Sequence, residues 1–345
     1  MKVLFCGLGS IGQRHLRNLR TLYGEKVEIL AWRQRGGGPV LNEDMTICPG
    51  AELEKTYGLR TFTDLELALS EKPDVAFITN PNSFHLTTAL AAARAGCHLF
   101  IEKPVADSLE GLDELACVVD HLRLVTFVAY QFRFHPGLRR VKALLDSGRL
   151  GRIVAAHIVN GEYLPDWHPW EDYRMTHPAR RELGGGCLRI QTHELDYAQW
   201  LFGMPRRVYA VGGHLSRLEL NVEDSVSLLL HCERDNRAVP VQIHLDYLQR
   251  PPQRICEVIG DSGRVRFDYY RQVVEFWELD ARTHEVVQFE KFERNEMFLA
   301  EQRHFWACIQ GTEKPLVDLT EGIRSLKIAL AASASMECGR AIEVV

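Results

Sequence analysis

The chain has 345 residues, of which 46% are hydrophobic and 25% are charged, and this composition excludes a disordered, fibrous or coiled-coil protein. At about 150 residues per domain, the length predicts two domains. A net charge of -5, from 41 Lys and Arg against 46 Asp and Glu, gives no electrostatic reason to bind nucleic acid or an anionic membrane.

The sequence also predicts a cytoplasmic protein with reduced thiols. The opening MKVLFCGLGSIG is an apolar run broken by glycines, and no stretch approaches the ~18 apolar residues of a membrane span. No C-x-x-C pair occurs, so we expect core thiols rather than a metal site or disulfides. The nine cysteines are Cys6, Cys48, Cys97, Cys117, Cys187, Cys232, Cys256, Cys308 and Cys338.

The first 130 or so residues alternate short apolar runs with helical patterns. Apolar residues recur at helical spacing between the runs, as at Leu16, Leu19 and Leu22. This alternation predicts a doubly wound parallel sheet, with one helix start at Thr63 and Asp64 and another at Ser108. The predicted strands are Val3–Cys6, Val27–Trp32, Asp74–Thr79, His98–Ile101 and Leu124–Tyr130, and Gly96 is a predicted helix stop.

After Tyr130 the pattern changes to many extended runs with turn residues between them. These runs predict a second, α+β domain with an open, mostly antiparallel sheet, so we divide the chain into residues 1–130 and 131–345. A helix is predicted at Gly137–Leu145, and an amphipathic helix at Leu319–Cys338 that is able to pack back on the first domain. The predicted strands are Ile153–Val159, Val208–Gly212, Ser225–Cys232, Val239–Tyr247, Ile255–Ile259, Arg264–Phe267 and Val273–Leu279.

A glycine motif directly follows the first predicted strand. Gly7, Gly9 and Gly12 form G-x-G-x-x-G, with Ser10 and Ile11 between the last two, at the opening of a helix. In a dinucleotide site the first glycine permits the tight turn, the second lets backbone approach a pyrophosphate, and the third permits close helix–strand packing. We therefore predict dinucleotide binding, against the alternative of a purely structural glycine turn.

The end of the second predicted strand bears on the choice of cofactor. About 20 residues beyond the motif, NAD-binding sites carry an acidic residue that binds the ribose 2'-hydroxyl. This chain has Arg33 and Arg35 there and no acid. Because arginine pairs with a 2'-phosphate, NADP is favoured. If the arginines are solvated or stack on adenine, NAD fits equally well.

Two further motifs follow predicted strands at the carboxyl edge of the sheet, beside the expected nicotinamide. The first, TNPNSFH, supplies Thr79, Asn80, Pro81 and His85 as predicted cofactor contacts; the second, IEKP, supplies Glu102 and Lys103. Hydride transfer to or from a carbinol carbon requires proton transfer at its oxygen, and a partly buried lysine of lowered pKa performs it. Lys103 is the predicted proton-transfer residue; the alternative is a surface lysine paired with Glu102.

These motifs, in this order, carry a resemblance. Together with GGGCLRIQTHELDYAQWLFG at 184–203, YQFRFHP at 130–136, VEDSVSLLL at 222–230 and EGIRSLKIALAASAS at 321–335, they resemble the glucose-fructose oxidoreductase and inositol dehydrogenase (Gfo/Idh/MocA) family. The resemblance covers most of the chain. It implies an N-terminal Rossmann domain, a C-terminal domain whose open sheet often builds oligomers, and NAD(P)-dependent oxidation or reduction of sugars, cyclitols or related polyols.

The resemblance also implies roles for individual residues. It assigns proton transfer to Lys103, and it assigns substrate hydroxyl binding and support of the proton transfer to His193. The family's usual aspartate, four residues after the last glycine, is replaced here by Ile190. We expect Gln191, on the same side of an extended segment as His193, to orient a substrate hydroxyl without acting as acid or base. Asp196 is as well explained by helix capping or packing as by substrate contact.

Substrate contacts are expected from a long aromatic loop, residues 163–174, and its neighbours. Aromatic faces and fans of polar groups hold sugars, and arginines grip a carboxylate or phosphate. The alternative is that the loop packs on itself or lies at a subunit interface. The candidate substrate residues are Lys103, Arg133, Tyr163, Trp167, Arg174, Gln191 and His193. No histidine or carboxylate cluster has metal-ligand spacing, so no metal is predicted.

Three functions remain open from the sequence. The favoured one is an NADP(H)- or NAD(H)-dependent oxidoreductase acting on a sugar, amino sugar, sugar acid or cyclitol. The others are a non-catalytic dinucleotide or metabolite sensor and an enzyme with tightly bound NAD and no net redox. In each case the expected partners are a small sugar or polyol and further copies of the chain, as a dimer or tetramer.

Overall fold

The computed structural model describes residues 1–33, 38–44 and 46–345. Its contacts divide the chain into two compact units. The first unit is Met1–Ala129 with Phe298–Ile323, and the second is Tyr130–Met297 with Arg324–Val345. Two long helices, α9 (Arg294–Ile309) and α10 (Leu319–Cys338), each have residues in both units. The bounds of α10 are those predicted from its amphipathic pattern.

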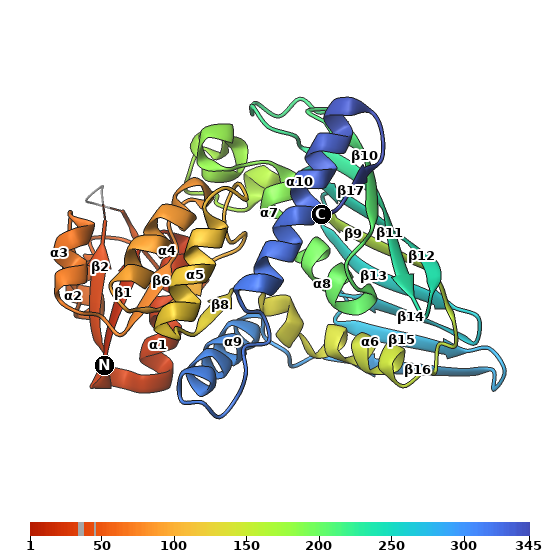
Figure 1. Ribbon diagram of the computed structural model, residues 1–345, viewed down its shortest axis with the longest axis horizontal. Helices are drawn as coiled ribbons and strands as arrows, with labels where there is room; N and C mark the ends of the chain where they lie inside the picture. The colour runs from red at the N-terminus through yellow and green to blue at the C-terminus, as the bar shows by residue number, and fades with distance from the viewer. Residues whose placement is uncertain (34–37, 45) are drawn as a thin grey trace. The chain divides into compact units, whose positions relative to one another are not determined.

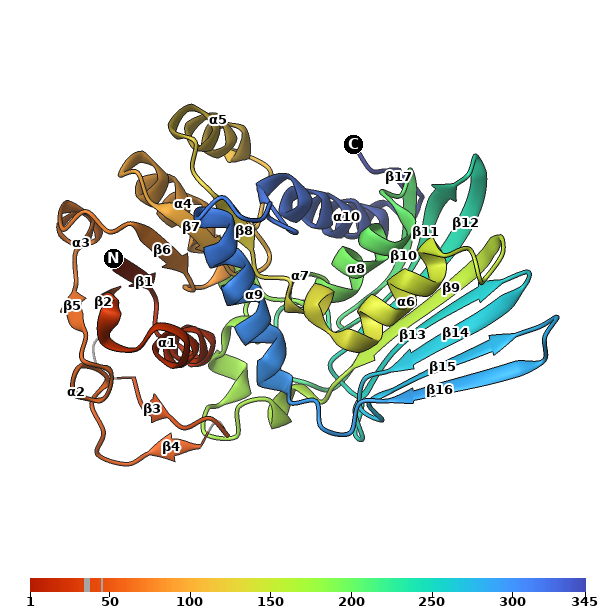
Figure 2. The ribbon, with the colours of Figure 1, turned by 90° about the horizontal axis from the view of Figure 1, so that it is seen from below.

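The first unit is built on a six-stranded sheet with the order β5-β2-β1-β6-β7-β8, in which every neighbouring pair is parallel. In Figure 2, α4 and α5 lie on one face of this sheet and α1 lies on the other. The strands are β1 (Lys2–Cys6), β2 (Glu28–Trp32), β5 (Arg60–Phe62), β6 (Val75–Ile78), β7 (His98–Ile101) and β8 (Thr126–Val128). The helices are α1 (Ser10–Tyr23), α2 (Leu53–Tyr57), α3 (Leu65–Ser70), α4 (His85–Arg94) and α5 (Leu112–Leu122). The doubly wound parallel sheet is confirmed.

Local chemistry explains how these elements start and stop. The Asp64 carboxylate accepts hydrogen bonds from the backbone N–H groups of Glu66 and Leu67, so the predicted start of α3 is confirmed. Beyond the end of α4, Gly96 has φ +88°, the left-handed conformation expected of a helix stop. The prediction that Ser108 starts a helix is wrong, because α5 begins at Leu112 after Gly111.

The second unit is built on a nine-stranded sheet with the order β16-β15-β14-β13-β9-β12-β11-β10-β17. Every neighbouring pair is antiparallel except β9 and β12, so the mostly antiparallel sheet is confirmed. The strands are β9 (Ile153–Gly161), β10 (Arg207–Gly213), β11 (Ser225–Arg234), β12 (Arg237–Asp246), β13 (Gln253–Gly260), β14 (Gly263–Asp268), β15 (Val273–Glu278), β16 (Thr283–Gln288) and β17 (Ile342–Glu343). The helices wholly in this unit are α6 (Pro136–Asp146), α7 (Cys187–Ile190) and α8 (His193–Phe202).

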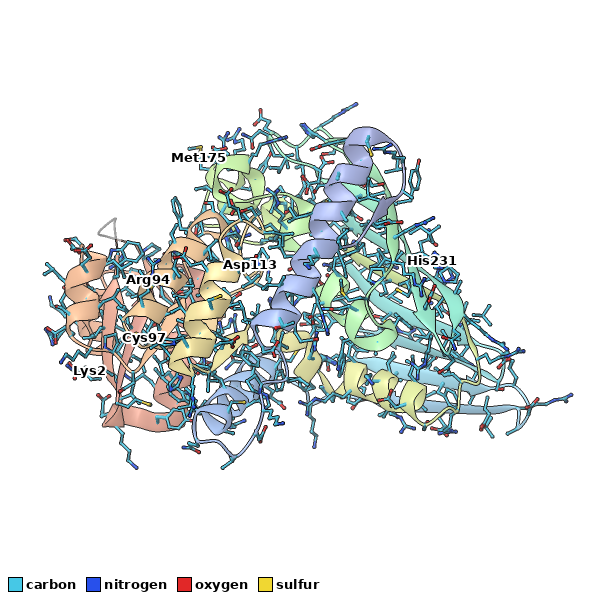
Figure 3. The ribbon with its side chains drawn as sticks, in the orientation of Figure 1. Lys2, Arg94, Cys97, Asp113, Met175 and His231 are labelled. Atoms are coloured by element: carbon cyan, nitrogen blue, oxygen red, sulfur yellow. The ribbon has the colours of Figure 1, made fainter. Side chains whose placement is uncertain are left out.

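The two faces of this sheet differ. Side chains alternate between buried and exposed along β10, β11 and β12, and α6 and α8 pack against the buried face (Figure 1). The other face exposes apolar side chains, among them Tyr209, Val211 and Leu229, which are 42–58% exposed. His231 of β11, labelled in Figure 3, is also exposed on this strand.

The structure adds elements that the sequence patterns missed. These are α2, β3 (Val40–Leu41), β4 (Ile47–Cys48), β5, β16, β17, α9 and the α7–α8 pair. Because α7 and α8 are helices, the expectation that Gln191 and His193 share an extended segment is wrong. All nine cysteines are free, but Cys117 and Cys338 are exposed and Cys48 is half-buried, so only six are core thiols. No helix among the described residues is long and apolar enough to cross a membrane.

Candidate active site

The glycine motif forms a cradle at the carboxyl end of β1. Gly7 has φ +103°, and a Cβ on it would lie 2.9 Å from the backbone nitrogen of Asn80. A Cβ on Gly12 would lie 2.5 Å from the Gly7 carbonyl oxygen, whereas nothing lies within 4 Å of a Cβ on Gly9. The N-cap of α1 is Gly9, and no side chain caps this end of the helix. The turn, the close packing and the open helix N-terminus fit a bound pyrophosphate, as the motif predicted.

The loop after β6 closes one side of this cradle. The Thr79 hydroxyl donates a hydrogen bond of 2.6 Å to the Gly7 carbonyl oxygen. The Asn80 amide donates to the Thr88 hydroxyl at 2.9 Å. Pro81 follows in an extended conformation and begins a short 3-10 turn. The structure therefore brings the first part of TNPNSFH to the glycine turn.

The end of β2 carries the residue on which cofactor choice was predicted to depend. The Arg33 guanidinium lies 3.5 Å from a carboxylate oxygen of Glu54, which follows the first residue of α2, and the Arg33 side chain is 12% exposed. The predicted contact Arg35 lies outside the described residues. An acid from α2 therefore stands beside Arg33, although none follows β2 directly.

Glu102 and Lys103 follow β7 at the same edge of the sheet. The Glu102 side chain is buried, and its two oxygens have different partners within the first unit. Oε1 lies 2.7 Å from Nε2 of His15 on α1, and Oε2 accepts a hydrogen bond of 3.2 Å from the Lys103 backbone N–H. Lys103 itself is half-buried. The IEKP segment is thus attached to the helix that opens the glycine cradle.

His85 attaches IEKP to the TNPNSFH loop. Its Nδ1 lies 2.7 Å from the Pro104 carbonyl oxygen and its Nε2 lies 2.8 Å from the Asn80 carbonyl oxygen. The ring is 1% exposed, and burial lowers the pKa of His85 below its ordinary value, against the effect of the two carbonyl contacts. At neutral pH the His85 side chain connects the two loops. These two contacts explain its buried position without the expected cofactor contact.

In the second unit, His193 is the first residue of α8. It is 5% exposed, and its Nε2 lies 3.2 Å from the side-chain nitrogen of Gln131. Its ring packs against Phe132, with the ring centroids 5.0 Å apart, and edge-on against Tyr130 at 5.7 Å. A short 3-10 turn and the start of α8 therefore fix the orientation of this imidazole.

Arg133, expected from the sequence to contact the substrate, is buried and paired with a residue of α8. Its guanidinium donates to both carboxylate oxygens of Asp196, at 2.9 and 2.7 Å, and the two side chains are 2% and 1% exposed. Such a bidentate pair is a strong structural tie. We assign Arg133 and Asp196 to the support of α8, which is the packing role considered for Asp196.

Gln191 is also buried, and it binds backbone. Its amide donates a hydrogen bond of 2.9 Å to the carbonyl oxygen of Asp246, and it is 2% exposed. Its Oε1 has no hydrogen-bond partner among the described residues, so this oxygen remains the group able to meet a substrate hydroxyl. Ile190, at the family's aspartate position, is 6% exposed and belongs to the hydrophobic core.

The aromatic loop pairs largely with its own unit. Arg250 lies over the Tyr163 ring at 4.9 Å, and Trp167 packs edge-on against Tyr247 at 5.4 Å. The Arg174 guanidinium donates to the carboxylates of Asp172 and Glu219 at 2.8 and 2.6 Å. These contacts fit the alternative of a self-packed loop, although Arg174 is about half-exposed.

Sequence reasoning missed three polar residues that contact candidate residues within their own units. In the first unit His15 contacts Glu102 and Gln302 contacts His15, and in the second unit Gln131 contacts His193. A histidine or glutamine within a helical pattern is usually an ordinary packed or solvated residue. The sequence therefore did not indicate a role for His15 or Gln302. Gln131 had one indirect signal, because the loss of a carboxylate at Ile190 implies that another group orients His193. Among the described residues, no group of three or more His, Cys, Asp or Glu forms a metal site.

Comparison with known families agrees with this geometry. Residues 1–130 match the model described as "Oxidoreductase family, NAD-binding Rossmann fold", and residues 138–266 match the "GFO/IDH/MocA C-terminal domain". The chain belongs to the Gfo/Idh/MocA family. The family supports a nicotinamide dinucleotide as the cofactor.

The relatives that the chain matches are named for several different activities. The chain is 31% identical over 213 residues to the 2,7-anhydro-N-acetylneuraminate hydratase of Mediterraneibacter gnavus, covering 60% of this chain and 54% of that protein. It is 32% identical over 165 residues to the levoglucosan dehydrogenase of Pseudarthrobacter phenanthrenivorans, covering 47% and 42%. The matched regions thus span about half the length of these relatives. The myo-inositol 2-dehydrogenase of Thermotoga maritima is 24% identical, with 100% and 98% covered.

Solved structures share the whole fold. The WlbA dehydrogenase of Bordetella pertussis, solved with NADH and UDP-GlcNAcA, has a TM-score of 0.81 and 22% identity, with 100% of this chain and 98% of that chain covered. A levoglucosan dehydrogenase solved with NADH has a TM-score of 0.83 and 19% identity, with 100% and 99% covered. At these identities the likeness shows the fold.

Proposed function

We propose that this chain is an oxidoreductase that transfers a hydride between NADP(H) or NAD(H) and a CH–OH carbon of a sugar, amino sugar, sugar acid or cyclitol. The observation that carries the proposal is the glycine cradle at β1 together with Lys103 at the end of β7, two strands away in the same sheet. Ligands of open α/β sheets bind at these strand ends. The names of sugar and inositol dehydrogenases among the relatives support the substrate class.

In this proposal the first unit binds the cofactor, which supplies or accepts the hydride. Gly7, Gly9, Ser10, Ile11 and Gly12 hold the pyrophosphate at the N-terminus of α1. The strand-end residues Thr79, Asn80, Pro81, Glu102 and Lys103 line its nicotinamide end. Arg33 pairs with a 2'-phosphate, and for this reason we propose NADP ahead of NAD.

Lys103 moves the proton that accompanies the hydride. In oxidation the neutral amine accepts the hydroxyl proton, and in reduction the ammonium group donates it to the carbonyl oxygen. His193 binds a substrate hydroxyl and supports this transfer, with its ring held by Gln131. We propose residues 1–130 as the dinucleotide domain and residues 131–345 as the domain for substrate binding and assembly.

Substitution of Lys103 tests the proposal. Lys103→Met keeps the apolar stem and removes the proton, so turnover with NADPH or NADH and a panel of keto sugars should fall by about 10²–10⁴-fold. Cofactor affinity, measured by fluorescence titration, should change little. His193→Asn should raise KM more than it lowers kcat. Wild-type turnover by Lys103→Met on a confirmed substrate would refute the proposed role.

A second function has one specific observation in its favour. The relative at 31% identity is named a hydratase, and hydration changes no net oxidation state. A tightly held NAD that oxidises and then re-reduces the substrate fits that reaction class. Protein that purifies with NAD, converts substrate without changing the absorbance of added NADH and loses activity on cofactor removal would favour this function.

A further inference from the structure

Arg254, the second residue of β13, is a buried cation that the proposed chemistry does not use. It is 8% exposed, and its Nε lies 2.9 Å from Oε1 of Glu194, whose side chain is fully buried on α8. Its Nη1 lies 3.6 Å from Oε1 of Glu162. A buried charge is costly unless it is paired and hydrogen-bonded, so these carboxylates are what allow Arg254 to be buried.

The Glu194 carboxylate is also bound from the neighbouring strand. Asn160 of β9 stands directly opposite Arg254 in the antiparallel pair of β9 and β13, so the two side chains lie on one face of the sheet. The Asn160 side-chain amide donates to Oε2 of Glu194 at 3.2 Å, and Asn160 is fully buried. Each oxygen of Glu194 therefore has a donor from the sheet, and these contacts fix the first turn of α8 to β9 and β13.

Arg254 also lies over an aromatic ring that contacts His193. The centre of its guanidinium is 4.3 Å from the ring centroid of Phe132, which is 2% exposed. The same ring packs against the imidazole of His193, with the ring centroids 5.0 Å apart. Phe132 belongs to the 3-10 turn Gln131–Phe134, whose first residue contacts His193 Nε2 at 3.2 Å. A desolvated cation is attracted to a ring face, so the guanidinium holds this turn as well as α8.

We propose that Arg254 is a positioning residue for His193: it holds the residue that follows His193 in α8, and it holds the ring against which the imidazole packs. This inference rests on the proposed role of His193 in binding a substrate hydroxyl. A hydrogen bond weakens steeply away from linear geometry, so affinity for that hydroxyl depends on the direction of the imidazole nitrogen. By fixing the start of α8 and the 3-10 turn together, Arg254 contributes to substrate affinity through His193.

The charges of Arg254 and Glu194 depend on each other. Burial lowers the pKa of Arg254, but Glu194 and Glu162 raise it above its ordinary value, so the guanidinium is charged. Burial raises the pKa of Glu194, and Arg254 acts in the opposite direction. Removal of the arginine alone leaves a buried carboxylate without its cation, which is destabilising in itself. The test therefore includes a variant in which both charges are removed.

The reactivity of His193 toward diethyl pyrocarbonate measures how firmly the imidazole is held, and it needs no substrate. The wild-type residue is 5% exposed, so its modification rate, read by mass spectrometry of its peptide, should be low. A charge-assisted hydrogen bond and a desolvated cation–ring contact each correspond to about a factor of ten in an equilibrium constant. Arg254→Met should therefore raise the modification rate of His193 about tenfold or more. The rate at His85, which is 1% exposed in the first unit, should not change.

Two further variants separate positioning from lost stability. Arg254→Met/Glu194→Met leaves neither partner of this pair buried alone, so it serves also if Arg254→Met does not fold, and its rate at His193 should stay about tenfold above the wild type. Arg149→Met is the matched control, because Arg149 also pairs with a carboxylate, that of Glu285 at 2.7 Å, and lies over a phenyl ring at 4.4 Å. It should leave the rate at His193 unchanged. A wild-type rate in the double variant, or an equal rise in Arg149→Met, would overturn the proposal.

Turnover provides the second readout. Arg254→Met/Glu194→Met should raise KM for the substrate about tenfold, with a smaller change in kcat. In the His193→Asn background the same two substitutions should change KM by less than about twofold, because the imidazole through which Arg254 acts is gone. An equal rise in both backgrounds would contradict a role through His193. If the modification rate rises as expected but no keto sugar oxidises NADPH or NADH, the positioning of His193 by Arg254 stands and the proposed redox function fails.

Discussion

Substitution of Arg33 decides the proposed preference for NADP. A charge-assisted hydrogen bond contributes about 1.5–3 kcal/mol, and about 1.4 kcal/mol is a factor of ten in a dissociation constant. If Arg33 binds the 2'-phosphate, Arg33→Ala should raise the Kd of NADPH about tenfold to about 150-fold. NADH has no 2'-phosphate, so its Kd should change by less than about twofold.

The ion pair with Glu54 refines the expected magnitude. In the structure the Arg33 guanidinium lies 3.5 Å from the Glu54 carboxylate, which is 43% exposed, and the phosphate must compete with it. An exposed pair of this kind is worth about 0.2–1 kcal/mol. Glu54→Gln should therefore tighten NADPH binding by about 1.4-fold to about fivefold and leave NADH unchanged.

Fluorescence titration of each variant with NADPH and NADH measures both effects. Glu52→Gln is the matched control, because Glu52 pairs with Lys55 rather than with Arg33. Equal losses for both cofactors in Arg33→Ala would show that the arginine contacts a part of the cofactor that NADH shares. Tighter NADH than NADPH in the wild type would refute the reasoning altogether.

Three further predictions concern the second unit. Asp196→Ala should lower the free energy of unfolding by about 3–5 kcal/mol in urea denaturation, because it leaves the buried Arg133 guanidinium without this carboxylate. The control Asp172→Ala, at the exposed Arg174 pair, should lower it by less than about 1 kcal/mol. The exposed apolar face of the nine-stranded sheet should be buried in an interface between copies of the chain. Leu229→Glu on this face should therefore lower the mass measured by light scattering, whereas the control Leu67→Glu in the first unit should not. A wild-type protein that is monomeric at micromolar concentration would contradict this prediction. Ile190→Asp should destabilise the protein without raising kcat.

Much of the first unit could be predicted because its pattern is local. Every residue of β6, and every residue of β1 except Lys2, is buried, and such short buried runs mark strands of a parallel sheet covered on both faces. The Asp64 cap and the Gly96 stop depend on one residue each. By contrast, Ser108 has the right residue type for a cap, but the helix starts only after the left-handed Gly111. A cap residue predicts a helix start only where the backbone turns at that point.

The irregular parts of the second unit were harder to predict from the sequence. Alternation along β10–β15 predicts half-buried strands, but β16 has no buried residue and so no clear pattern. Helix α9 was missed because nonpolar and polar residues do not segregate along Arg294–Ile309. The α7–α8 pair follows a glycine run in a nearly all-buried stretch, and burial on every side removes the helical period.

The candidate site residues also differ in how far the sequence could predict them. Gly7, Gly9, Gly12 and Lys103 could be predicted as site residues because each is a particular residue type at a particular strand end. The pairing of Arg133 with Asp196 was not predicted, because a sequence cannot show that a residue 63 positions away binds it. His15 is separated from Glu102 by 87 positions, and only the packing of α1 on the sheet brings them together. Residues that support others through long-range contacts are the part that sequence alone does not reveal.

Ile190 stands at the position of the family's usual aspartate. Its side chain is 6% exposed within the core cluster of the second unit. Loss of a buried isoleucine side chain costs about 2–5 kcal/mol, and a buried carboxylate costs more unless it is paired. The imidazole three residues later is already in contact with Gln131 at 3.2 Å, so an aspartate at 190 would add no orientation that His193 lacks.

We therefore expect Ile190→Asp and its uncharged control Ile190→Asn both to lower the free energy of unfolding by about 2–5 kcal/mol in urea denaturation. Neither should raise kcat above that of the wild type. Gln131→Leu should raise KM for the substrate, because it removes the contact that orients His193. A gain in kcat by Ile190→Asp, absent from Ile190→Asn, would instead mean that the site still has a place for the carboxylate and that Gln131 does not replace it.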